Sequence, residues 1–540
     1  MKRKQICKKF FGCLLAGTLI MGSLSGCGSQ TDVSKEVSES KPKEEVSTSQ
    51  PEEGEEKVTL TMAWTELAAI TAHSADISET ALGQAWQEAT GVELEIVNIA
   101  DRAAFNLLFA SGELPDILYY NFKNYPGGPQ AAISDGIIEP LTDYMEYAPN
   151  LQAVLDSNES YRQTVTTGEG DIIGFPWIRD SSTPGALSVN GIAIRQDWLE
   201  DLGLNTPQTA DEFYEVLKAF KEKKGAEYPL STYTTTHFIT ALSSGMITSP
   251  FGLVKGDFYQ KDGKVHYGFA EQEYRDVLEW LNKMYNEGLI DPNIASMDSA
   301  TFDANITNGT SGAGFVSCGT PDRLTIAGVQ VDPEYDLLGI APLVTADGKI
   351  AMSSQYSYPI NGAFCVITPA CENKEAAMKF LDYAYSEEGT MLFNFGIEGE
   401  SYEMVDGVPR ETELITNHPE GWTVLEAKAH YHLSWDSGPM IQLYIPESVT
   451  ERTRLTRSNF SKSTTEEYLM PQLFFDEETS AELSKYMGEI NTMVEEKLFK
   501  YIMGTESLDT FDNYVKTLYE FGLDKAIAIY QEGLDAYNSR

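Results

Sequence analysis

The stretch that decides the fold runs from residue 58 to residue 120: VTLTMAWTELAAITAHSADISETALGQAWQEATGVELEIVNIADRAAFNLLFASGELPDILYY. Apolar residues alternate with polar or small ones at 58–64 and 92–96, as in strands, and a short apolar run follows at 114–118. Between these segments, apolar residues recur at helical spacing around Trp86 and around Phe105. Successive strands joined by helices need parallel crossover connections, so we predict an α/β fold with an open, doubly wound sheet.

A sheet of this kind holds its ligands beyond the carboxyl ends of its strands. Trp64, Tyr119 and Tyr120 lie at the ends of the predicted strands. The first candidates for a ligand site are therefore aromatic.

The length of the chain indicates how many domains it forms, and its charge limits the kinds of partner it can bind. At 540 residues it is too long for one ordinary core, so we expect two domains or more. Its net charge is −43, from 39 basic and 82 acidic residues. Nucleic acid is excluded as a partner, because a phosphate backbone requires a basic face. The same charge disfavours broad contact with an anionic membrane surface.

The first 57 residues predict export and tethering. Basic residues at 2–9 precede an apolar run at 10–24 that is too short and too rich in glycine for a membrane span, so 1–26 is predicted to be a signal peptide. The sequence Leu24-Ser25-Gly26-Cys27 resembles the lipobox of bacterial lipoproteins, which implies cleavage before Cys27 and lipidation of its thiol. The alternative is a plain signal peptide. Segment 27–57 contains no aromatic residue and is predicted to be a flexible, acidic linker.

A second α/β unit follows the first. A strand is predicted at 191–195, and a helix at 209–225 begins with a capping box of Thr209 and Glu212 and ends at Gly225. Further elements are predicted as a helix at 274–285, a strand at 363–367, a helix at 376–384 and a helical tail from 508. The scattered cysteines Cys318, Cys365 and Cys371 form no disulfide framework and are expected to be small buried residues.

Several motifs resemble those of the family 1 extracellular solute-binding lipoproteins of ABC transporters, especially the long branch common in Firmicutes. SGELPDI at 111–117 is similar to the family's SG-(D/E)-LPDI strand, and DIIGFPW at 171–177 resembles its YGFP segment. Shorter similar stretches are RQDWL at 195–199, LGL at 202–204, YNEGLIDP at 285–292, NG at 308–309, EEG at 387–389 and YIMG at 501–504. The resemblance therefore covers nearly the whole chain.

This resemblance implies a two-lobe fold of the periplasmic-binding-protein kind, with hinge strands crossing between the lobes. Lobe 1 is expected at 58–175 with 361–420, and lobe 2 at 176–360 with 421–540. It also implies capture of a small-molecule ligand, a mono- or oligosaccharide, by closure of the cleft, and delivery to separate ABC permease subunits and an ATPase. We expect a monomer at the extracellular face of the cytoplasmic membrane, attached to that membrane through its lipid anchor only.

A sugar offers hydroxyls for hydrogen bonds and an apolar C–H face that packs on flat rings. A site for it should therefore combine aromatic residues with charged or amide groups. The residues that we predict to bind the ligand are the aromatic residues Trp64, Trp177 and Trp435, then Tyr120 and Tyr358, with Arg179 and Asp180 as polar partners. Each of these rings could instead serve only in packing.

The sequence contains no GxSxG, HExxH or GxxxxGK[ST] motif, so we expect neither an enzyme nor a cofactor. His430 and His432 are two residues apart, and a structural role is favoured over zinc binding. Two alternatives stay open. One is a cell-surface carbohydrate-active enzyme, because a pair of carboxylates for glycoside cleavage needs no sequence motif. The other is a ligand receptor that serves a sensor kinase.

Overall fold

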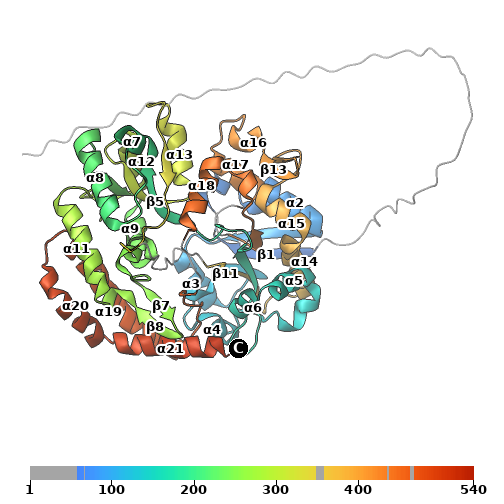
Figure 1. Ribbon diagram of the computed structural model, residues 1–540. Coiled ribbons are helices and arrows are strands. Elements are labelled where there is room, and N and C mark those ends of the chain that lie inside the picture. The colour runs from blue at the N-terminus through green and yellow to red at the C-terminus, as the bar shows by residue number, and fades with distance from the viewer. Residues whose placement is uncertain (1–57, 66, 348–357, 434–436, 463–466, 540) are drawn as a thin grey trace, which may run out of the picture. The chain divides into compact units, whose positions relative to one another are not determined.

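The structure is a computed structural model, and it describes residues 58–539 except 66, 348–357, 434–436 and 463–466 (Figure 1). The predicted signal peptide, the lipidation site Cys27, the linker and Trp435 lie outside the described residues. No helix in the described part of the chain combines the length and the apolar character that a membrane crossing requires.

The first sheet contains six strands in the order β14-β4-β11-β3-β1-β2. Strand β1 is parallel to β2 and β3, β11 is antiparallel to β3 and β4, and β14 is parallel to β4. The bounds are β1 (Val58–Trp64), β2 (Val92–Asn98), β3 (Ile117–Asn121), β4 (Phe175–Arg179), β11 (Ile360–Ile367) and β14 (Met440–Gln442). The parallel pairing predicted for the first three strands is thus confirmed.

The motif residue Asp116 lies just before β3 rather than inside it. Its carboxylate accepts hydrogen bonds from the backbone N–H and the hydroxyl of Thr61, at 2.8 and 2.7 Å. This side-chain contact joins the loop to β1, so pairing with β1 begins only at Ile117.

Helices α2 (Ala81–Thr90), α3 (Arg102–Ser111) and α14 (Lys374–Asp382) belong to the same part of the fold. Trp86 on α2 donates from Nε1 to the carbonyl of Phe380 on α14 at 2.9 Å, and the two rings stack with centroids 4.0 Å apart. Segments almost 300 residues apart in sequence therefore share one core.

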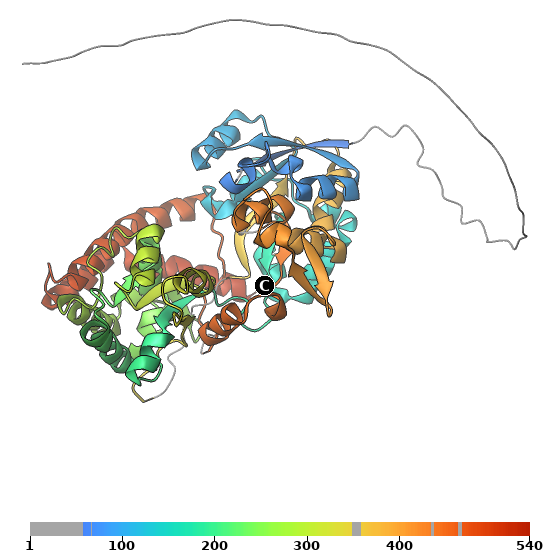
Figure 2. The same ribbon diagram turned by 90° about the horizontal axis from the view of Figure 1, so that it is seen from above.

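The second sheet has the order β10-β5-β9-β6. Its strands are β5 (Asn190–Arg195), β6 (Leu230–Thr232), β9 (Ala313–Ser317) and β10 (Leu337–Gly339). Helix α8 (Ala210–Lys224) has the predicted capping box of Thr209 and Glu212 and ends at Gly225 in the left-handed conformation. The helical tail packs on this unit. Asn282 on α11 (Glu273–Asn286) donates to the carbonyl of Tyr501 on α19 (Glu477–Ile502), and Figure 2 shows the red tail beside the green helices.

Arg195, from the RQDWL motif, is buried at the end of β5. It forms an ion pair with Asp197 at 2.5 Å, and its guanidinium lies 4.6 and 4.0 Å from the ring centres of Trp198 and Tyr335. The motif thus builds a packed charged pair beneath the second sheet.

Two large cores accompany the two sheets, and their membership differs from the predicted lobe boundaries. Ala429, Leu433 and Met440 pack into the core of the first sheet, as do Trp177 and Ile178. The reason is that β4 and β14 pair with each other and β4 pairs with β11, which draws 176–179 and 421–442 into the first unit. The exact lobe boundaries stay a prediction.

The three described cysteines, Cys318, Cys365 and Cys371, are free and buried, as predicted. Burial raises the pKa of Cys371 to about 11. The thiolate form needed for metal binding or nucleophilic chemistry is therefore disfavoured at neutral pH.

Candidate functional site

At one edge of the first sheet, five strands end and the sixth, β11, begins. Because β11 is antiparallel to both β3 and β4, strands β1, β2, β3, β4 and β14 all run in one direction and β11 runs against them. The last residues of the five therefore lie beside the first residues of β11. We call this the carboxyl edge, and it is formed by residues 64–65, 98–99, 121–123, 179–180, 358–360 and 442–444.

The chain passes between the two sheets at this edge. Strand β4 ends at Arg179 and the chain continues to β5, while β14 ends at Gln442 and leads to α18 (Glu451–Phe460), which packs on β10. The carboxyl edge therefore contains segments that lead from one unit to the other, where a two-lobe binding protein holds its ligand.

All the predicted ligand-binding residues that the structure describes lie at this edge or within two residues of a strand end there. They are Trp64 on β1, Tyr120 on β3, Trp177 and Arg179 on β4, Asp180 after β4, and Tyr358 before β11. The topology thus brings together residues that are up to 294 positions apart, from Trp64 to Tyr358.

Three of these rings are buried in the described structure. Trp177 has no exposed surface, Trp64 is 1% exposed and stacks on Tyr119 at 4.8 Å, and Tyr120 packs against Phe105. Buried rings offer no face to a ligand in this conformation. Direct ligand contact by Trp64, Tyr120 and Trp177 stays a prediction, while Arg179, Asp180 and Tyr358 are partly exposed.

The Tyr358 ring lies beside the ammonium group of Lys123 at the carboxyl edge. The Nζ atom of Lys123, just after β3, lies 5.3 Å from the centre of the Tyr358 ring. The Tyr358 hydroxyl donates to the carbonyl of Met470 at 2.7 Å, which fixes the ring. Desolvation lowers the pKa of Lys123 to about 8, although the residue is exposed to solvent.

Gly362 makes room for Lys123. It has φ +93°, and a Cβ at this position would lie 2.8 Å from Cε and 2.9 Å from Cγ of Lys123. The pairing register of β11 with β4 shifts between Ile360 and Phe364, around this glycine. The irregular strand thus holds the lysine stem across its backbone.

Arg179 and Asp180 end β4. The Arg179 guanidinium lies 4.8 Å from the centre of the Trp177 ring, so Trp177 supports the cation rather than presenting its own face. The Asp180 carboxylate accepts from the backbone N–H and hydroxyl of Ser182, at 2.9 and 2.8 Å. Asp180 is thus engaged in shaping the turn that leaves the sheet.

A third cation at this edge was not predicted. Arg457 on α18 lies 4.5 Å from the centre of the Tyr444 ring, two residues beyond β14. Its Nη1 donates to the carbonyl of Ala186 at 3.0 Å, and its buried Nε has no hydrogen-bond partner among the described residues. Sequence patterns did not suggest this pair because its members lie on different elements, one of them a mostly polar helix.

A histidine cluster near the end of β1 was also not predicted. The ring of Trp422 is sandwiched between His73 and His418, each with centroids 4.0 Å away. His430 meets the Trp422 ring edge-on and its Nδ1 lies 3.3 Å from the Ser74 hydroxyl, while Glu426 lies 3.6 Å from His73. Both faces of Trp422 are occupied, so the cluster joins α17 (Val424–Tyr431) to the chain after β1.

The described histidines, cysteines and carboxylates form no group of three or more that could hold a metal ion. His432, two residues after His430, is instead buried, and desolvation lowers its pKa to about 4.

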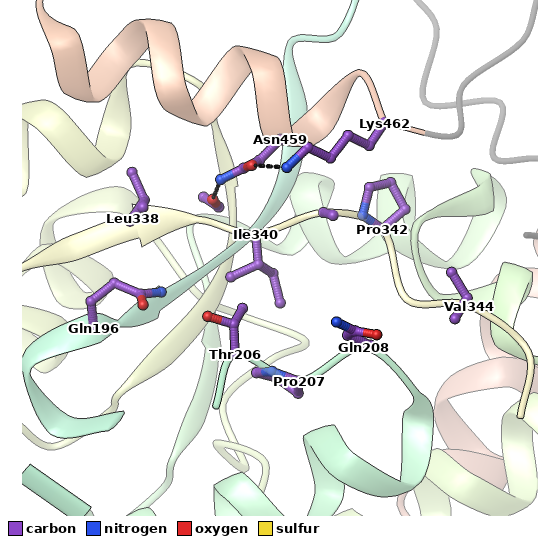
Figure 3. A pocket seen from close by; sticks show the side chains of 12 residues that line it. Gln196, Thr206, Pro207, Gln208, Leu338, Ile340, Pro342, Val344, Asn459 and Lys462 are labelled. Atoms are coloured by element: carbon purple, nitrogen blue, oxygen red, sulfur yellow. Dashed lines mark hydrogen bonds between the residues drawn. The ribbon is translucent and has the colours of Figure 1, made fainter. Parts of the chain in front are cut away.

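A cavity lies elsewhere, beside β10 (Figure 3). It has a volume of about 640 Å³ and is lined by residues 338–342 together with Gln196, Gln208, Asn459 and Lys462. Two of its polar side chains are hydrogen-bonded: Asn459 donates to the Gly339 carbonyl at 2.7 Å, and Lys462 donates to Asn459 at 2.8 Å. The Nε2 atom of Gln196, also in the lining, is buried and has no hydrogen-bond partner among the described residues. The carboxyl edge has the richer set of aromatic and charged groups.

The comparison with protein families decides the class. The family described as "Bacterial extracellular solute-binding protein" matches residues 72–391, more than half of the chain. The chain belongs to this family. The resemblance seen in the motifs is thereby confirmed.

Characterised relatives of this solute-binding protein share about a quarter of its residues. The fructooligosaccharide ABC transporter substrate-binding protein FusA of Streptococcus pneumoniae is 24% identical over 86% of this chain and 88% of its own length. Lipoprotein LipO of Bacillus subtilis is 28% identical over 68% of this chain and 72% of its own length. The polygalacturonan/rhamnogalacturonan-binding protein YtcQ of the same species is 25% identical over 83% of this chain and 86% of its own length.

Solved structures confirm the fold. Alginate-binding protein AlgQ2 has a TM-score of 0.70 at 23% identity, over 89% of this chain and 99% of its own. FusA of S. pneumoniae in complex with kestose has a TM-score of 0.70 at 22% identity, with the same coverage. The two-lobe fold expected from the motifs is therefore confirmed.

Proposed function

We propose that this solute-binding protein captures a carbohydrate for an ABC importer. The observation that carries the proposal is the family match together with the similarity over most of the chain to FusA and YtcQ, whose names state binding of fructooligosaccharide and of polygalacturonan/rhamnogalacturonan. The aromatic and charged groups gathered at the carboxyl edge supply the chemistry that a sugar requires.

The ligand would be held between the two units and released unchanged. Micromolar capture corresponds to about −8 kcal/mol. For closure to report that ligand is bound, the ligand must favour the closed state; moving the balance from 1:99 to 99:1 takes about 5.5 kcal/mol of differential binding. The segments that leave the carboxyl edge at Asp180 and after Gln442 are the proposed hinges.

The protein would act as a monomer at the extracellular face of the cytoplasmic membrane, attached through a lipid on Cys27. The lipobox-like sequence before Cys27 and the lipoprotein LipO among its relatives support this. The permease subunits and the ATPase would be separate chains. Mass analysis of the amino-terminal peptide tests the anchor: a diacylglyceryl group on Cys27 is expected, and a free thiol there would contradict it.

A thermal-shift screen of the full-length protein against a library of neutral and acidic oligosaccharides tests the function. Binding to the folded state raises the melting temperature by mass action, so at least one saccharide should raise it. Chromatography of the recovered ligand should show it intact. A flat screen would contradict carbohydrate capture, and new reducing ends would contradict a purely binding role.

A further inference from the structure

Two segments that cross between the sheets are described along their whole length: 180–189, from β4 to β5, and 443–450, from β14 to α18. They leave the first sheet side by side, because Gln442 pairs with Arg179 and its carbonyl accepts from the Asp180 N–H at 3.0 Å. Closure of two lobes requires a few residues in such segments to change their backbone angles. The contacts made along each segment show where that change can occur.

Tyr161 attaches the first segment to the unit of the first sheet. It lies on α6 (Glu159–Val165), and its ring belongs to the core of that sheet. Its hydroxyl lies 2.9 Å from the Ser181 hydroxyl and accepts from the Ser181 backbone N–H at 3.3 Å. The first segment is therefore fixed to the first unit as far as Ser181.

Asn394 attaches the second segment to the same unit. It lies on α15 (Glu387–Phe395), next to the buried core residue Phe393. Its side-chain amide donates to the Ile441 carbonyl at 2.7 Å and accepts from the Leu443 N–H at 2.8 Å. The second segment is therefore fixed to the first unit as far as Leu443.

Arg457 on α18 contacts both segments further along. Its Nη1 donates to the Ala186 carbonyl at 3.0 Å, and its guanidinium lies 4.5 Å from the centre of the Tyr444 ring. Gly185, beside Ala186, has φ +87°, and a Cβ there would lie 3.4 Å from the carbonyl oxygen of Arg457. The turn of the first segment thus packs against the backbone of α18 as well as against the arginine side chain.

Helix α18 is itself fixed to the second sheet. Asn459 donates to the Gly339 carbonyl at 2.7 Å, and the Thr456 hydroxyl accepts from the Gly339 N–H at 3.3 Å. Phe460 is fully buried, and a Cβ at Gly191 of β5 would overlap its ring. The segments that Arg457 contacts are therefore held to the second unit.

The stretches between the two sets of attachments are short: 182–184 in the first segment, and the link from Leu443 to Tyr444 in the second. We propose that Arg457 is a positioning residue for closure, which clamps both crossing segments to the second unit and confines the pivot to these two stretches. Without the clamp, 185–189 and 444–450 would gain backbone freedom, and closure would have to order them again. Closure around a ligand is part of the proposed function, on which this inference rests, whereas the clamp itself is present in the free protein.

Hydrogen–deuterium exchange of the full-length protein without ligand, followed by mass spectrometry, tests the clamp. Arg457→Gln should raise amide exchange by up to about tenfold in 185–189 and in 444–450 together, because one side chain supports both. Exchange in β5 and β10 should stay unchanged. A rise in one segment alone or in neither, or an equal rise in β5 and β10, would overturn the clamp. Because no ligand is present, each of these results would leave carbohydrate capture standing.

Arg452→Gln is the matched control. Arg452 lies on the same helix and donates to the Leu337 carbonyl at 3.0 Å, so this contact stays within the second unit. Its loss should leave exchange in both crossing segments unchanged. Tyr444→Leu removes the ring beside the guanidinium without altering α18, and it provides a second result if Arg457→Gln does not fold. Exchange in 444–450 should rise in this variant as well, and no rise would overturn the clamp.

The distance between the two units gives a readout that a purely local role would not change. Spin labels attached to unnatural amino acids at two exposed positions, Leu107 on α3 and Ile326 on α13 (Thr320–Gly328), report this distance by double electron–electron resonance. Arg457→Gln should broaden the distance distribution of the free protein, and Arg452→Gln should not. Equal widths for Arg457→Gln and the parent protein would overturn the proposal, because the pivot would then be set by other contacts.

Discussion

The Nζ atom of Lys123 lies 5.3 Å above the Tyr358 ring, and desolvation lowers its pKa from 10.5 to about 8. A lowered pKa means that folding disfavours the charged form. The cost is fully present below pH 8 and disappears as the pH rises through 10.5, where the unfolded lysine also loses its proton. The protein thus keeps a cation at its carboxyl edge at some expense of stability, as is common at binding sites.

Lys123→Met should therefore stabilise the free protein at pH 7. Because Lys123 is exposed to solvent, screening reduces the gain in unfolding free energy to about 1 kcal/mol. Urea denaturation at pH 7 and pH 9.5 measures it, and the gain should shrink at the higher pH. A variant that is less stable at pH 7 would show that the ammonium group is favourably paired.

Much of the fold followed from local sequence signals, and so did the meeting of the candidate residues at one edge of the first sheet. Thr209, Glu212 and Gly225 mark the bounds of α8, and the alternation at 58–64 and 92–96 marks two paired strands. The predicted residues gathered at one edge because strand direction alone decides where strand ends meet. Sequence patterns could not tell that Trp177 lies beneath Arg179, since burial depends on β14 and β11 on either side of β4.

Contacts between distant segments could not be predicted from the sequence for the same reason, because they depend on the tertiary arrangement. Nothing in the sequence near 73 or 422 indicates that His73 and Trp422 stack, because their packing depends on how α17 is placed after the loop at 396–423. The same holds for Arg457 and Tyr444. The pairing of β14 with β4 also gave no sequence signal, because β14 consists of three residues, too few for a periodic pattern.

The sandwich of Trp422 between two histidines should stabilise the fold. Trp422→Ala removes two stacked pairs, each worth about 0.5–1.5 kcal/mol beyond area burial, so the unfolding free energy should fall by about 1–3 kcal/mol. Trp422→Phe should retain part of this. Chemical denaturation measures both, and no loss for Trp422→Ala would mean that α17 is held by other contacts.

His432 should make the protein sensitive to acid. Its pKa in the fold is about 4, because burial disfavours the charged form, whereas the unfolded residue titrates near 6.5. Between pH 7 and pH 5 the unfolded state binds the proton first, which lowers the unfolding free energy by about 2 kcal/mol. His432→Leu should lose less stability over this interval than the wild type. Identical slopes for His432→Leu and wild type would contradict a buried neutral imidazole.

The buried pair of Arg195 and Asp197 should show strong coupling. Arg195→Met leaves Asp197 without its closest cation and should cost about 3–5 kcal/mol. The double variant Arg195→Met/Asp197→Leu should cost clearly less than the sum of the single variants in a denaturation cycle. Additive losses would mean that the two side chains act independently.

The measurement that tests the central claim most directly is a crystal structure of the protein with a saccharide bound. The account predicts an intact sugar at the carboxyl edge, with Lys123, Arg179 and Tyr358 in contact with it. A sugar seated in the cavity beside Asn459 and Gln208, with the carboxyl edge empty, would contradict it.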